Sequence, residues 1–174
     1  MQELDKRLGL LRLLLADIQG KQAQLAEMEG QYQAQLSRIV DFVVYREGDV
    51  ANALSLMSEV QGKLDEVVQT AAHLSLIENR ATTELDVLKL TKQVTDARSQ
   101  LADLEQRQRD LSSRLEALSG PRADVEGDAD RPIEDIRTVQ TEVSDVQGEI
   151  ARLNDLITEA SERAARMIQA ATRG

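Results

Sequence analysis

Apolar residues recur along this chain at alternating spacings of three and four residues, and the pattern is sustained over three long stretches. This heptad spacing places the apolar residues on one stripe of an α-helix, where a partner helix covers them. The pattern therefore predicts long helices that pack as coiled coil. We call each such stripe of core residues a seam.

The first helix is expected over residues 1–47. Its seam has a polar residue at two positions, Gln22 and Glu29. Gly48 is suited to the left-handed conformation that ends a helix, and Asp49 is a good N-cap for the next one. A continuous helix through Gly48 is the alternative interpretation. The predicted seam residues are Leu8, Leu11, Leu15, Ile18, Leu25, Tyr32, Leu36, Ile39 and Val43.

The second helix is expected over residues 49–119, with two seams that are offset from each other near residues 85–90. An offset rotates the apolar stripe around the helix, so one helix offers different faces to two partners. The first series is Val50, Ala53, Met57, Val60, Leu64, Val67, Ala71, Leu74, Ala81, Leu85 and Leu88, with Glu78 in a core position. The second series is Val87, Leu90, Val94, Ala97, Leu101, Leu104, Leu111, Leu115 and Leu118, with Gln108 in a core position.

An acidic loop is expected over residues 120–131, because Gly120 and Pro121 stop the second helix. The third helix is expected over residues 132–174, with Asp130 as its N-cap and Pro132 in its first turn. Its seam residues are Ile136, Val139, Val143, Val146, Ile150, Leu153, Ile157, Ala160, Ala164, Met167 and Ala171.

The lengths of the helices predict how they pair. The first helix matches the first half of the second helix in length, and the third helix matches the second half. We therefore expect an all-α fold of long antiparallel coiled-coil hairpins, with three helices and a central spine helix of roughly 100 Å. This gives one elongated domain with an extended trace of two hairpins. A compact three-helix bundle is the alternative.

Several apolar residues lie outside the seams, and a second apolar face usually requires a second partner. We therefore expect a homo-oligomer or a larger helical assembly, in which Gln22, Glu29, Glu78 and Gln108 set register and the choice of partner helices. The surplus residues are Leu10, Leu13, Leu14, Val40, Phe42, Val44, Leu54, Leu56, Val68, Leu76 and Ile77.

Composition argues against several classes of function. The net charge of −10 disfavours nucleic acid as a partner. Cysteine is absent and His73 is the only histidine, so neither a metal site nor a catalytic triad based on these residues is expected. We predict a protein that is not an enzyme and needs no cofactor.

The C-terminal stretch Ala164–Gly174 carries Ile168, Gln169, Arg173 and Gly174 at spacings that resemble the first part of an IQ motif. The resemblance covers residues 168–174 and stops before the second basic position of that motif. It implies a helix that is gripped by a calmodulin-like light chain. Met167 and Ala171 also continue the coiled-coil seam, which is the simpler interpretation of this stretch.

The sequence has no transmembrane run and no signal peptide, and the expected compartment is the cytoplasm. The stretch Leu8–Ile18 is amphipathic enough for peripheral membrane contact, although core packing is the favoured interpretation. The leading hypothesis is a non-catalytic coiled-coil scaffold that mediates self-assembly or helix–helix interaction. The alternatives are recruitment of a calmodulin-like light chain and a membrane-associated polymerising hairpin.

Overall fold

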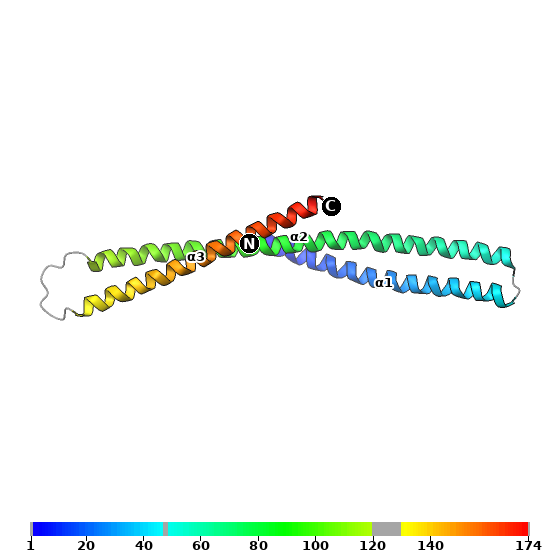
Figure 1. The fold of residues 1–174 in the computed structure, drawn as a ribbon, viewed down its shortest axis with the longest axis horizontal. Coiled ribbons are helices and arrows are strands. Elements are labelled where there is room, and N and C mark those ends of the chain that lie inside the picture. Colours follow the sequence, from blue (N-terminus) through cyan, green and yellow to red (C-terminus); the bar gives the residue numbers. More distant parts are fainter. Residues whose placement is uncertain (1, 47–48, 120–129, 174) are drawn as a thin grey trace. The chain divides into compact units, whose positions relative to one another are not determined.

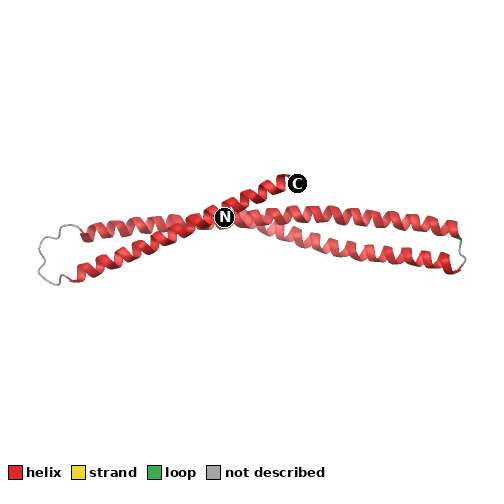
Figure 2. Ribbon diagram, viewed as in Figure 1, coloured by secondary structure: helices red, strands yellow, loops and turns green. Residues whose placement is uncertain are grey.

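The structure is a computed structural model that describes residues 2–46, 49–119 and 130–173. Within these ranges the chain forms three helices and no strand: α1 (Gln2–Arg46), α2 (Val50–Ser119) and α3 (Asp130–Arg173). Figure 2 shows that helix accounts for almost all of the described chain. The predicted all-α class, with helical hairpins and a long second helix, is confirmed.

Asp49 is the N-cap of α2, as the sequence predicts. Its Oδ1 atom accepts hydrogen bonds from the backbone N–H groups of Ala51 and Asn52, at 3.1 and 3.3 Å. These bonds satisfy donors that have no acceptor within the first turn of a helix. The predicted turn at Gly48 and the predicted acidic loop, up to residue 129, lie outside the described residues. Helix α3 begins at Asp130.

The chain divides into two compact units, Met1–Asp86 and Val87–Gly174. The division falls within α2, inside the stretch of residues 85–90 where the sequence shows the offset between its two seams. Each unit holds one pair of helices and is described by itself. The prediction of one elongated domain stays a prediction.

In the first unit α1 and the first part of α2 run antiparallel (Figure 1). Arg7 meets Glu84, and Gln22 meets Glu78, so residues later in α1 lie beside residues earlier in α2. Such pairs exclude a continuous helix through Gly48. One seam prediction at the tip of this hairpin is wrong: Val50 is 55% exposed because it begins α2, beyond the residues that α1 covers.

In the second unit α3 packs against the second part of α2 (Figure 1). The centre of this contact is a cluster of Leu111, Val139 and Val146, and Val139 is 1% exposed. Half-buried apolar residues from both helices surround the cluster: Leu104, Leu115, Leu118, Val143 and Ile150. All of these positions belong to the predicted seams, so each helix of the unit buries a single stripe.

We expect Asp49→Ala to lower the free energy of unfolding by about 1 kcal/mol, because two N–H groups lose their acceptor. The melting temperature should fall by roughly 2–4 °C, as measured by circular dichroism. Asp49→Asn is the matched control, since its amide oxygen still accepts both bonds. Equal melting temperatures for the Ala and Asn variants would show that the cap contributes nothing.

Candidate functional site

The candidate functional surfaces of this chain are the faces of its helices. In the first hairpin, the predicted seam residues Leu11, Ile18, Val60 and Val67 are buried, together with Leu8, Ala53, Ala81 and Leu85. Val50 is exposed, and the side chain of Val43 lies outside the described residues. The other apolar residues of the predicted seams are half-buried: Leu15, Leu25, Tyr32, Leu36, Ile39, Met57, Leu64, Ala71, Leu74 and Leu88. Two helices therefore cover each other along one stripe and leave the rest of each helix in solvent.

Two of the polar seam residues meet each other. Gln22 Nε2 donates a hydrogen bond to Glu78 Oε2 across the hairpin, at 2.9 Å, and both residues are half-buried. A bond of this kind in an apolar seam favours the one register in which both partners are satisfied. The sequence places both residues in core positions, but their direct pairing is a finding of the structure.

The other polar seam residues have different surroundings. Glu29 is half-buried and accepts a hydrogen bond from Gln33 Nε2, one turn further along α1, at 3.1 Å. Gln108 is half-buried on the seam of the second hairpin, between Leu104 and Leu111.

The predicted seam residues of the second unit face the interior of its helix pair. Five of them are buried: Ala97, Leu111, Val139, Val146 and Ala160. Others are half-buried, among them Leu101, Leu104, Leu115, Val143, Ile150, Leu153 and Ile157. One predicted position differs, because Ala171 near the end of α3 is exposed.

The large apolar residues that lie outside the seams are concentrated on the first hairpin. Leu10 and Leu13 are 67% and 70% exposed, and among the described residues of the second unit only Ile133 and Ile168 are comparable. The other exposed apolar residues of the first hairpin are Leu14, Met28, Val40, Phe42, Val50, Leu54, Leu56, Val68 and Leu76. Exposure of the predicted surplus residues is thus confirmed, except that Ile77 is half-buried and the side chain of Val44 lies outside the described residues.

A shallow hollow of about 260 Å³ lies near the tip of the first hairpin. Its apolar lining is Ile39, Phe42, Ala53 and Leu56, and its polar lining includes Arg38, Asp49 and Asn52. Heptad spacing does not predict this hollow. The one sequence feature that points to it is the small Ala53 at a seam position, among larger apolar residues such as Phe42 and Leu56.

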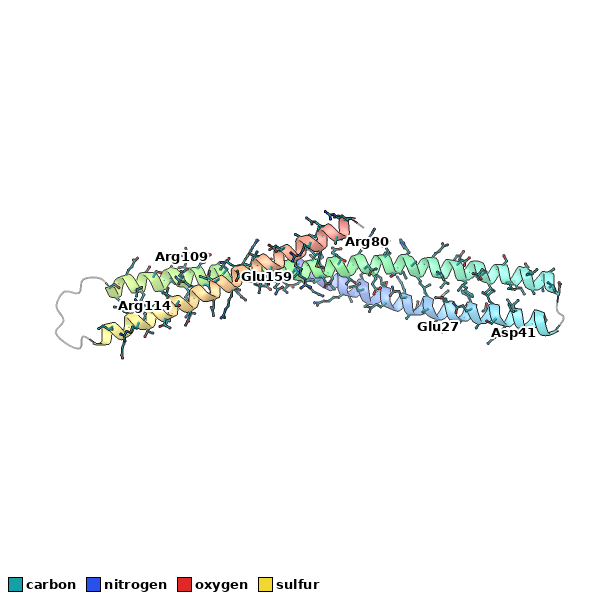
Figure 3. All side chains as sticks on the ribbon, viewed as in Figure 1. Glu27, Asp41, Arg80, Arg109, Arg114 and Glu159 are labelled. Carbon is teal, nitrogen blue, oxygen red and sulfur yellow. The ribbon has the colours of Figure 1, made fainter. Side chains whose placement is uncertain are left out.

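Ion pairs lie on the flanks of the first hairpin. Arg7 bridges the two helices through Glu84 at 2.6 Å, while Lys21 pairs with Asp17 along its own helix at 2.7 Å. The remaining charged residues are largely solvated, such as Glu27 and Asp41 of α1, which are labelled in Figure 3.

Lys63 pairs with Glu59 along α2 at 2.6 Å. The hydrogen bond, aided by the attraction between the two charges, lowers the pKa of Glu59 from its usual 4.5 and raises the pKa of Lys63 from 10.5. Both groups are solvated, so their contribution to stability is small. The Glu59 contribution exists above the unfolded-state pKa and is lost as the pH falls through the lowered value.

The residues that resemble an IQ motif lie at the end of α3. Ile168 is 50% exposed, and the neighbouring Gln169 and Arg173 are exposed as well. Gly174 lies outside the described residues. Met167, the seam residue of this stretch, is half-buried.

The described part of the chain contains no group of three or more residues with metal-binding side chains. His73 is exposed on α2. No helix in residues 2–46, 49–119 and 130–173 is both long and apolar enough to cross a membrane. Comparisons with protein-family models, with curated proteins and with solved structures found no match.

We expect the Gln22 and Glu78 side chains to be energetically coupled. The double variant Gln22→Leu/Glu78→Leu should be more stable than the unchanged chain, because it replaces a polar pair in the seam with an apolar one. Each single variant leaves one half-buried polar group without its partner. A double-mutant cycle, measured by urea unfolding, should give a coupling energy of about 1 kcal/mol. Additivity to within about 0.3 kcal/mol would contradict the pairing.

Proposed function

We propose that this protein is a non-catalytic coiled-coil scaffold, which presents helical faces to copies of itself or to partner helices. The observation that carries the proposal is the exposed apolar surface of the first hairpin. Scattered apolar residues are ordinary on protein surfaces, whereas several along the flanks of one hairpin are typical of an interaction site. A third or fourth helix would cover these flanks.

The contrast between the two hairpins supports this proposal. Both hairpins follow the same heptad spacing, so both bury a single stripe per helix. The second hairpin leaves mainly polar and charged residues outside that stripe, with Ile133 and Ile168 as its large exposed apolar residues among those described. Among the described residues, the first hairpin alone has exposed large apolar residues along both of its helices. We therefore assign assembly to the first hairpin.

Charge favours ordered association over general aggregation. The net charge of −10 makes copies of the chain repel each other at long range. Association then requires a matched apolar surface that outweighs this repulsion at short range. An acidic chain also repels phosphate backbones, so we propose protein helices as the partners and the cytoplasm as the compartment.

We expect the purified chain to form a discrete oligomer at micromolar concentration. Light scattering coupled to size exclusion should give a mass that is a multiple of 19.3 kDa, because solvent-exposed apolar flanks are buried on association. Raising the salt concentration should favour the oligomer by screening the repulsion between acidic chains. A mass of 19.3 kDa at every concentration would contradict self-assembly. The proposed partner would then be a different helical protein.

The exposure of Ile168 favours a second candidate function, recruitment of a calmodulin-like light chain through the end of α3. In that case calmodulin should bind the chain in isothermal titration, and Ile168→Ala should weaken binding by roughly tenfold or more, since a buried apolar anchor is lost. Leu10→Ala, an equally apolar change in the first hairpin, is the control. If titration of calmodulin into the unchanged chain gives no heat of binding, this candidate function is ruled out.

A further inference from the structure

The residues that flank the seam of the first hairpin are arranged symmetrically about Met28. When Leu8 and Leu11 are taken as heptad positions a and d, each g position is the residue directly before an a position. Arg7 and Glu84 are both g positions, and their side chains meet at 2.6 Å. The g positions of α1 and α2 therefore share one face of the hairpin, which we call the g face.

On α1 the g face alternates between polar and apolar residues. Leu14, Met28 and Phe42 are its apolar members, and they are 43%, 38% and 50% exposed. Each is two heptads from the next, or about 21 Å along the helix. Lys21 and Gln35 lie between them. A two-fold axis at Met28 would place Met28 against Met28 of a second copy. Leu14 would then lie against Phe42 of that copy, and Lys21 against its Gln35.

The g positions of α2 have the same symmetry. Their order is Asp49, Leu56, Lys63, Thr70, Ile77 and Glu84, so a two-fold axis between Lys63 and Thr70 would place Leu56 on Ile77 and Asp49 on Glu84 of a second copy. This axis lies close to the axis at Met28. The contacts of Arg7 with Glu84 and of Gln22 with Glu78, and the hollow that Phe42 shares with Leu56, place the point on α2 level with Met28 within residues 63–72.

We propose that the g face of the first hairpin binds the g face of a second copy of this chain, in a two-fold antiparallel arrangement of four helices. The inference rests on the proposed scaffold function and names the surface and the partner. Helices with apolar residues at a, d and part of g are the type that packs in four-helix bundles. An isologous interface requires a self-complementary surface, and the g face satisfies this requirement on both of its helices.

Charge complementarity supports the same arrangement. The two-fold axis sets Asp49 opposite Glu84 of the second copy, and Arg7, which pairs with Glu84 at 2.6 Å, supplies a positive charge beside these two carboxylates. Asp17 and Arg38 are almost equidistant from Met28 in sequence, so the axis would bring Asp17 near Arg38 of the second copy. Asp49 and Arg38 both line the hollow at the tip, whose apolar lining would receive Leu14 of the second copy.

The area of the g face fits a stable dimer. From Leu14 to Phe42 the face is about 42 Å long, at 1.5 Å per residue. Two helices of about 10 Å diameter make it about 20 Å wide. The product is about 800 Å² for each partner, which is the size of a standard specific interface.

A different two-fold axis, parallel to the helices, would place α1 on α2 of the second copy. Met28 would then lie against Lys63, whose ammonium group is held by Glu59 at 2.6 Å. Burying an ammonium group against a thioether is unfavourable, because the charge loses water and gains no acceptor. The antiparallel axis at Met28 instead places Met28 against Met28, and Lys63 against Thr70, of the second copy.

Cysteine cross-linking tests the arrangement, since the chain has no cysteine of its own. In the full chain, Met28→Cys should form a disulfide-linked dimer on mild oxidation, because the two residues meet at the axis within the reach of a disulfide. Glu27→Cys is the matched control: it is exposed on the same helix, one residue away and outside the g face (Figure 3). It should stay mostly monomeric on denaturing gels.

A charge substitution tests the same axis without oxidation. Met28→Lys would place two ammonium groups on each other, and it should raise the dimer dissociation constant at least about tenfold in sedimentation equilibrium. Leu54→Lys is the control, because Leu54 is 60% exposed and lies on the opposite flank of the hairpin. It should leave the dissociation constant within about twofold.

The outcomes separate this inference from the proposed function. If the unchanged chain is an oligomer but Met28→Cys does not cross-link above the Glu27→Cys control, the g-face arrangement is wrong and the scaffold function stands. Equal weakening by Met28→Lys and Leu54→Lys would also overturn the g-face arrangement. If the unchanged chain is monomeric at every concentration, self-assembly itself is wrong.

Discussion

Each hairpin of this protein depends on the covering of one apolar stripe by another. Two helices that pack along a heptad seam shield about two residues in seven on each helix, and most other positions stay in solvent. This geometry explains why half-buried residues such as Leu15 and Leu64 outnumber fully buried ones in the first seam. It also explains why any apolar residue outside the seam is exposed unless another helix covers it. The proposed function follows from this limit on what two helices can bury.

Polar groups in a thin seam have a larger effect than they would in a wide core. Gln22 and Glu78 interrupt the apolar contact of the first hairpin, and they satisfy each other only in the observed register. A shift of one heptad would leave a half-buried carboxylate without its donor, which opposes sliding of the two helices. The pair therefore trades stability for uniqueness of register. A defined register is needed for assembly as well, because the alignment of g positions on α1 and α2 depends on it.

The sequence predicts the helices and their seams well because heptad spacing is a local property with a single structural meaning. The three helices, the cap at Asp49 and the exposure of Leu10 and Leu13 follow from spacing and capping chemistry alone. The exposure of Val50 did not follow, because it depends on where α1 stops covering α2. The hydrogen bond between Gln22 and Glu78 needed the register between helices. The hollow at the tip needed the side-chain volumes opposite Ala53 as well.

The g positions show what heptad analysis adds once the register is known. From the sequence, Leu14 and Phe42 are two surplus apolar residues among many, and Met28 is not among those predicted. The contact between Arg7 and Glu84 places them on one face, and the hollow shared by Phe42 and Leu56 aligns that face with the same positions of α2. Surplus residues elsewhere, such as Leu10 and Leu13, lack this symmetry. A random scatter of apolar residues would rarely match under one two-fold axis on both helices. This coincidence is the physical reason to treat the g face as an interface between copies, and the remaining apolar residues as candidates for other contacts.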